Sequence, residues 1–204
     1  MTSLPKVSIV LPIHNMKNGA FFLWRCINSI MEQTFKDYEI VITKEGSMPV
    51  NTNAGIKKAR GELVKILYMD DWFAHPNVLW GLVNLFDRYE DVEWHISPCD
   101  TNPNPELTDD LHLGNNKLGS PSALTLRNHF EDNLLFDEKL SWLLDCDLYK
   151  RMRDKFGNPS ITAYVDINIG VGDHQVTHLM NDDYKLSEHE YLQKKYEKSS
   201  SNRS

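Results

Sequence analysis

The chain has 204 residues, of which 41% are hydrophobic and 25% charged, so a single folded, soluble domain is expected and a disordered or fibrous chain is excluded. Its net charge of −7 provides no positive field for a phosphate backbone, which argues against nucleic acid as a partner. Cys26, Cys99 and Cys146 lie far apart without a CxxC pair. We therefore expect three free, mostly buried thiols and no disulfide framework or zinc site.

The first half of the chain alternates predicted strands and helices. Residues 6–13 read as a buried strand closed by Pro12, residues 19–33 as a helix, residues 38–43 as a strand, residues 44–55 as a turn-rich segment, residues 54–61 as a short helix and residues 62–69 as a strand. This order predicts a parallel, right-handed α/β layer. The apolar run near the N-terminus is too short for a membrane span, so a cytosolic protein is expected, unless another chain recruits it to a membrane.

The second half is less regular. Residues 76–89 predict a helix, residues 92–97 a strand, and residues 98–122 a long loop rich in Pro, Asn, Asp and Gly, of the kind that is functional or mobile. A helix is expected from Trp142 to a stop at Gly157, followed by one strand or a pair within residues 160–171. The tail from residue 185 predicts a short surface helix with a disordered Ser- and Lys-rich end.

Polar clusters follow each of the first three strands, at residues 14–15, 44–47 and 70–71. Ligands of open α/β sheets bind beyond the carboxyl ends of the strands, so all three clusters can meet one ligand. The adjacent carboxylates of Asp70 and Asp71 repel each other unless a cation or a donor-rich ligand neutralises them. The alternative is a pair of solvated turn or N-cap aspartates.

Four stretches in this order resemble the family 2 inverting glycosyltransferases of the GT-A fold: "VSIVLPIHN", "INSIMEQTFKDYEIVI", "NAGIKKARGELVKILYMDDWFAHP" and "FDEKLSWLLDCDLYKRM". The resemblance covers roughly residues 5 to 180. It implies a single domain over residues 1–180 with a Rossmann-like, mostly parallel central sheet flanked by helices. Its nucleotide-sugar half would be about 1–98 and its acceptor half about 99–180, with residues 181–204 as a surface helix and disordered tail.

The resemblance implies a metal site for Mn²⁺ or Mg²⁺. In the family the aspartate element binds a divalent ion that bridges the donor diphosphate, because the leaving group's developing charge needs a hard cation with oxygen ligands. Asp70 and Asp71 match this element, with Asp71 favoured for the metal and Asp70 for the ribose. Another acid of the family pattern is replaced by Tyr68. His174, in "GDHQVTH", matches a histidine that completes the metal or diphosphate site, and His178 is its competitor.

Asp145 matches the family's catalytic base, with Leu144 in place of the usual Glu. Inversion requires a base on the face opposite the leaving group, which removes the proton of the attacking acceptor hydroxyl. The alternative is that Asp145 and Asp147 only stabilise a helix N-terminus through its dipole, the role expected for Asp147.

Further donor-binding residues follow from the same matches. His14 takes the place of an aromatic that stacks on uracil, and Glu45 takes the place of the acid that accepts the uracil N3–H bond, while Lys44 replaces the family's neighbouring Asp. The complete expected donor-binding set is Pro12, His14, Asn15, Glu45, Asn53, Asp70 and Asp71. The segment from residue 47 to 53 is shorter than in relatives, which usually insert a helix and a strand there.

Two tryptophans are expected to shape the acceptor pocket. Trp72 follows the aspartate pair and Trp142 precedes Asp145, and aromatic faces suit the C–H surfaces of sugars. Core packing is the commoner use of tryptophan.

The leading functional hypothesis is a metal-dependent transferase that moves a sugar from a nucleotide donor, a UDP-sugar, to a hydroxyl with inversion. The acceptor would be a glycan, a glycoprotein or a lipid-linked sugar, by analogy with stand-alone domains that decorate bacterial or viral glycans, in the cytoplasm (the host cytoplasm for a viral protein). One alternative is a non-catalytic carbohydrate- or nucleotide-sugar-binding relative. Another is a sugar-phosphate nucleotidyltransferase, although its Gly- and Arg-rich phosphate loop does not follow the first strand here.

Overall fold

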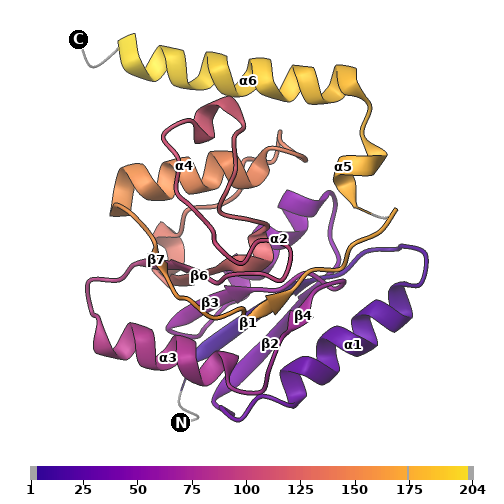
Figure 1. Cartoon of the computed structure of the whole chain (residues 1–204), viewed down its shortest axis with the longest axis vertical. Helices are drawn as coiled ribbons and strands as arrows, with labels where there is room; N and C mark the ends of the chain where they lie inside the picture. The colour runs from indigo at the N-terminus through magenta and orange to yellow at the C-terminus, as the bar shows by residue number, and fades with distance from the viewer. Residues whose placement is uncertain (1–3, 174, 202–204) are drawn as a thin grey trace.

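A six-stranded sheet forms the centre of the computed structural model, which describes residues 4–173 and 175–201 (Figure 1). Its strands lie in the order β2 (Tyr38–Thr43), β1 (Val7–Pro12), β3 (Leu63–Ile66), β6 (Leu124–Arg127), β5 (Trp94–Ile96) and β7 (Ser160–Ile161). All pairs are parallel except those of β6, which is antiparallel to both neighbours. The expected α/β class with a mostly parallel sheet is therefore confirmed.

Helices cover both faces of this sheet. They are α1 (Gly19–Met31), α2 (Met48–Lys58), α3 (Val78–Arg88), α4 (Leu144–Phe156), α5 (Val176–Leu179) and α6 (Asp182–Ser201). In Figure 1, α1 and α3 lie below the sheet, α2 and α4 lie above it, and α6 is outermost. Three short 3₁₀ turns, η1 (Leu111–Leu113), η2 (Pro121–Ala123) and η3 (Phe130–Asp132), interrupt the long connections.

Strand β1 shows why the sheet forms here. All six of its residues are buried because helices cover both faces, and this explains the continuous apolar run in its sequence. β1 pairs with β2 on one side, from Val7↔Tyr38 to Pro12↔Thr43, and with β3 on the other. The ends of these three strands therefore meet at one edge.

The structure differs from the sequence-based expectation in α2 and β6, and it resolves the alternatives left open for residues 160–171. Helix α2 begins at Met48, inside the predicted turn-rich segment, because Pro49 fits the first helical turn and the Thr52 hydroxyl bonds back to the Met48 carbonyl. Strand β6 was not predicted, since four residues give too short an alternation to stand out beside a long loop. The segment 160–171 contains a pair of strands: β7, and β8 (Ile167–Asn168), which pairs with β4 (Trp72–Phe73).

Helix α6 is longer than the predicted surface helix, and it continues to Ser201 through the Ser-rich stretch where disorder is expected. It forms because its inner side is buried against the protein, through Glu188 and Leu192. The three cysteines are free and buried, as expected. No helix in the described residues has the length and apolar character to cross a bilayer.

Candidate active site

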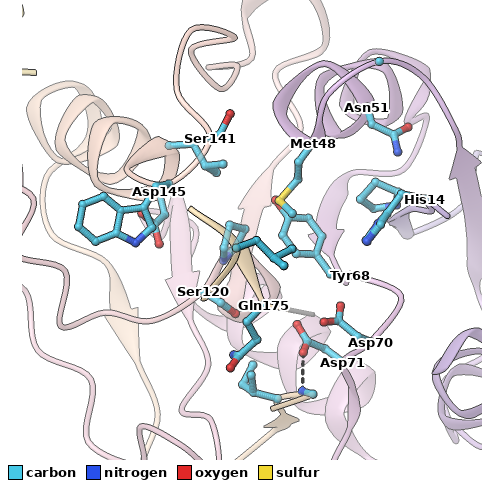
Figure 2. A pocket seen from close by; sticks show the side chains of 18 residues that line it. His14, Met48, Asn51, Tyr68, Asp70, Asp71, Ser120, Ser141, Asp145 and Gln175 are labelled. Atoms are coloured by element: carbon cyan, nitrogen blue, oxygen red, sulfur yellow. Dashed lines mark hydrogen bonds between the residues drawn. The ribbon is translucent and has the colours of Figure 1, made fainter. Parts of the chain in front are cut away.

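A cavity of about 400 Å³ lies beyond the carboxyl ends of β1 and β3. Six of the residues singled out from the sequence line it, and they come from both halves of the chain (Figure 2): Pro12, His14, Asp70, Asp71, Trp142 and Asp145.

The aspartate pair lies in the turn that follows β3. The Asp71 amide donates to the Tyr68 carbonyl at 3.0 Å, and the Arg25 guanidinium donates to the Asp70 carbonyl at 2.8 Å. Asp71 is 4% exposed, and its Oδ1 accepts a 2.8 Å hydrogen bond from the Gly170 amide. A Cβ on Gly170 would lie 2.3 Å from the Asp70 carbonyl oxygen, so only glycine allows the chain after β8 to pass this close.

Burial raises the pKa of Asp71 to about 7, and the neighbouring charge of Asp70 adds to this shift. The Ser122 hydroxyl, the Gly170 amide and the Lys65 charge oppose it. Burial and the charge of Asp70 disfavour the ionised form of Asp71, and a bound cation would stabilise that ionised form.

The pair fits a hard divalent ion as part of a ligand set. Mg²⁺ is typically bound by one or two carboxylates together with substrate phosphates, and Mn²⁺ also suits oxygen ligands. Among residues 4–173 and 175–201, no cluster of three or more His, Cys, Asp or Glu side chains could hold a metal by itself. His174, the expected third ligand, lies outside the described residues, and His178 is exposed on α5.

A buried lysine lies behind the part of the cavity that Asp70 and Asp71 line. Lys65, in the middle of β3, is fully buried, and its ammonium donates to the Ser122 carbonyl at 2.5 Å. The Ser122 hydroxyl in turn accepts from the Tyr68 amide at 2.9 Å. Burial lowers the pKa of Lys65 to about 8. The sequence analysis missed this residue, although a lysine inside the apolar run "LVKI" is the signal that could have found it.

Asp145 lies in the first turn of α4, and Figure 2 shows it on a different wall from the Asp70–Asp71 pair. Its Oδ2 accepts from the Asn116 amide at 2.8 Å, and its Oδ1 accepts from the Cys146 backbone amide at 2.7 Å. Burial raises the pKa of Asp145 to about 6. The carboxylate is therefore ionised near neutral pH and still basic enough to take a proton.

Two further cavity residues were not assigned a role from the sequence. The Tyr68 ring projects into the cavity (Figure 2), and its hydroxyl is buried without a hydrogen-bond partner among the described residues. Asn51 joins two strand ends, because its amide donates to the Ile13 carbonyl and accepts from the Glu45 backbone amide, both at 2.9 Å. The sequence pattern shows Tyr68 only as a replacement of the family's acid, and it predicts a turn around Asn51.

Three of the expected donor-binding residues lie outside the cavity lining. The Asn15 side-chain oxygen Oδ1 accepts from the Lys44 ammonium at 2.9 Å, and the Glu45 carboxylate pairs with Lys58 at 2.6 Å. Asn53 is buried, and its amide bonds both backbone groups of Phe136, at 2.8 and 2.9 Å. Donor-binding roles for these three residues therefore depend on the resemblance alone.

The two tryptophans differ in position. Trp142 lines the cavity beside Asp145. Trp72 lies outside the lining, and its ring is covered by the Arg25 guanidinium, whose carbon is 3.4 Å from the ring centroid. An acceptor contact therefore stays a prediction for both residues, and only Trp142 borders the cavity.

Solved structures share the fold of this chain. Staphylococcus aureus TarS (residues 1–349) in complex with UDP-GlcNAc superposes with a TM-score of 0.64 at 14% identity, over 86% of this chain and 61% of TarS. The mannosyltransferase PcManGT of Pyrobaculum calidifontis, in complex with GDP-Man and Mn²⁺, gives a TM-score of 0.62 at 14% identity, over 85% of this chain and 59% of that protein. The chain has a GT-A fold. At these identities the likeness establishes the fold alone.

Curated relatives match shorter segments. An uncharacterized glycosyltransferase of Rickettsia bellii is 25% identical over 88 residues, which are 43% of this chain and 12% of that protein. Glycosyltransferase GlyA of Streptococcus pneumoniae is 28% identical over 100 residues, with 36% of this chain and 14% of GlyA covered. The chain thus spans a small part of the length of these relatives. No protein-family model matches the chain.

Proposed function

We propose that this chain is a glycosyltransferase that transfers a sugar from a nucleotide donor, a UDP-sugar, to a hydroxyl acceptor with inversion at the anomeric carbon. The observation that carries the proposal is a single cavity with carboxylates on two walls. The Asp70–Asp71 pair lines one wall, and Asp145, with a pKa of about 6, lines the other. A leaving diphosphate and an attacking alcohol need these two kinds of group on opposite sides of the sugar.

Asp70 and Asp71 would hold the divalent ion, Mn²⁺ or Mg²⁺, which supplies neutralisation of the charge that develops on the leaving nucleoside diphosphate. Asp145 takes the proton of the acceptor hydroxyl as that oxygen attacks the anomeric carbon. With a pKa raised to about 6, its carboxylate is mostly ionised at pH 7 and available as a general base. Trp142 offers an aromatic face for the sugar C–H groups next to this base.

The choice of donor has support from similar proteins. TarS was solved with UDP-GlcNAc and with UDP, and PcManGT with GDP-Man and Mn²⁺. These complexes favour a nucleotide sugar and a divalent metal. His14 lines the cavity and would stack on the base, and the match of Glu45 to a uracil-binding acid favours UDP. The acceptor class is a hydroxyl of a glycan, a glycoprotein or a lipid-linked sugar.

The test is a panel of UDP-sugars and GDP-mannose, with and without Mn²⁺. We expect at least one UDP-sugar to bind in a metal-dependent way by calorimetry and to release UDP. Asp71→Asn should weaken this binding strongly, because it removes a charged oxygen ligand. Asp91→Asn, an exposed aspartate in the turn after α3, is the matched control and should leave binding unchanged. Failure of every nucleotide sugar to bind in the presence of metal contradicts the proposal.

A binding protein without catalysis is the second candidate. It is favoured by the buried Leu144 at the place of the family's acid next to Asp145. This candidate predicts metal-dependent donor binding with no nucleotide release. If slow release is observed, an equal rate for the wild type and Asp145→Asn would also favour this candidate.

A further inference from the structure

Helix α6 reaches the segment that carries the proposed base. In Figure 1 it crosses the outer side of the molecule near α4, and at its centre Glu188 is only 3% exposed. The Glu188 carboxylate accepts three backbone hydrogen bonds, from Ser141 at 2.7 Å, Trp142 at 2.9 Å and Leu143 at 2.8 Å. These three residues lead directly into α4.

Within α4 itself, the first turn has one local carboxylate acceptor, because Asp145 Oδ1 accepts from the Cys146 amide. The N-cap residue of α4 is Leu143, which has no side chain able to accept from the free amides of the first turn. Hydrogen bonds from amides to a carboxylate are about twice as strong as neutral ones, and a negative charge is favoured at a helix N-terminus. Glu188 does not bond those first-turn amides, but it brings a buried negative charge from a distant helix to the three backbone amides just before α4, those of residues 141–143.

A second attachment lies just beyond the base. Asp147 is fully buried, and its carboxylate accepts from Arg151 of the same helix at 2.8 Å. It also contacts Lys195 at 2.6 Å and the Tyr196 hydroxyl at 2.8 Å, both from α6. Helix α6 thus holds the chain on both sides of Asp145.

We propose that Glu188 is a positioning residue for sugar transfer: by fixing residues 141–143 it sets the Asp145 carboxylate and the Trp142 ring in the cavity. This inference depends on the proposed function, in which Asp145 is the base. A displacement of about 1 Å in a catalytic group can cost roughly 100-fold in rate, so a support that holds the base through three backbone bonds has a direct effect on turnover. Donor binding depends on the Asp70–Asp71 wall, which Glu188 does not contact in the described structure.

The test is Glu188→Gln in the full chain, which keeps the size of the side chain and removes its charge and one strong acceptor. Glu190→Gln is the matched control, because Glu190 lies on the exposed side of the same helix, where it pairs with Lys194 at 3.4 Å. Nucleotide release, donor affinity and amide hydrogen exchange are measured well below the melting temperature of each variant. For Glu188→Gln we expect kcat to fall about 10- to 100-fold, as a misplaced base implies. Donor KM should stay within about twofold of the wild-type value, because the contacts that bind the donor equally in the ground state and the transition state are unchanged.

The exchange measurement tests the contact itself. Amides of residues 141–143 should exchange faster in Glu188→Gln and at the wild-type rate in Glu190→Gln. A variant with a lower melting temperature but wild-type kcat in the folded protein would overturn the proposal, because Glu188 would then act on stability alone. Unchanged protection of residues 141–143 would overturn it as well.

Failure of the proposed function gives a different result, namely a wild-type protein that binds no nucleotide sugar. Should Glu188→Gln not fold, Lys195→Gln removes one α6 contact with Asp147 and leaves Glu188 in place. It should lower kcat about 3- to 10-fold with donor KM unchanged, as expected for a partial loss of positioning. Wild-type kcat in that variant would contradict a positioning role for α6.

Discussion

The two walls of the cavity are built in different ways. Asp70 and Asp71 lie in the turn that follows β3, a strand that backbone ladders with β1 and β6 hold in position. Asp145 lies where a loop enters a helix, and side chains from distant segments, Asn116 and Glu188, fix its surroundings.

This difference separates binding from chemistry. The donor wall, which is the turn with Asp70 and Asp71, follows a strand that backbone ladders hold, and the side chains of Arg25 and Ser122 bond its backbone. A change of either aspartate there is expected to alter the charge of the wall more than its geometry. The acceptor wall is held by a few side chains, so a single change can move the base. Substitutions on the two walls should therefore affect donor affinity and turnover separately.

The largest effect is expected for Asp145→Asn, because the amide cannot take the acceptor proton. Loss of a general base typically costs 10²–10⁴-fold, so kcat should fall by roughly that factor while donor affinity is retained. Steady-state kinetics and calorimetry with the same UDP-sugar measure the two quantities. Equal losses in affinity and turnover would break the distinction between the walls.

Lys65→Met tests the buried charge behind the donor wall. The folded-state pKa of Lys65 is lowered to about 8 from 10.5, so the unfolded chain binds more protons between these values. The free energy of unfolding should therefore rise with pH from 8 to 10.5, by up to about 3 kcal/mol from this group, and the variant should lack that rise. Urea denaturation at pH 7.5, 9 and 10.5 gives the difference between the two proteins. A difference that is constant with pH would mean that burial does not lower the pKa of Lys65 in the folded protein.

Gly170→Ala tests the close approach that joins the β8 segment to the aspartate pair. The added Cβ would lie 2.3 Å from the Asp70 carbonyl oxygen, so the backbone has to move and the bond to Asp71 is disturbed. We expect a loss of about 1–3 kcal/mol in the free energy of unfolding, typical of overpacking, and weaker donor binding. Gly81→Ala is the control, since its Cβ would meet nothing within 4 Å inside α3 and should stabilise the helix by about 0.5–1 kcal/mol. Wild-type stability in Gly170→Ala would show that this segment yields easily.

The smallest effect is expected for Asn116→Ala, on the acceptor wall. The Asn116 amide favours the ionised form of Asp145, so its loss should raise the pKa of that carboxyl above about 6. A base must be unprotonated, so the acid limb of the kcat profile should move to higher pH, by at most about one unit. Asn115→Ala is the control, because its side chain bonds Asp110 at 2.7 Å and does not line the cavity. If the acid limb of the kcat profile does not move, the limb reports the titration of a group other than Asp145.

Sequence patterns predicted four residues that line the cavity on the donor side, Pro12, His14, Asp70 and Asp71, while Asn15, Glu45 and Asn53 of the same expected set lie outside the lining. The apolar runs of β1 and β2 and the polar residues at their ends have short-range signals, and strand pairing brings those ends together. Asp145 was found through the resemblance, not through a period or a turn signal. The functional roles of these residues remain predictions.

The parts that were missed depend on contacts between distant segments. Glu188 looks like an ordinary residue of a polar tail, and only the packing of α6 brings its carboxylate to residues 141–143. Lys65 stands in a strand whose pattern predicts an apolar residue, and its partner carbonyl belongs to η2. Sequence periodicity cannot predict which residues form such pairs, because the two partners come from segments that are far apart in the sequence.

The antiparallel strand β6 has a mechanical consequence. It comes from the second half of the chain, yet it lies between β3 and β5 and pairs with β3 from Leu63↔Arg127 to Lys65↔Thr125. A rigid-body hinge motion between the two halves would have to break the hydrogen bonds between β3 and β6, so the sheet cannot act as a hinge at this position. Opening and closing around a ligand then falls to the connecting loops, and the sheet acts as a fixed frame.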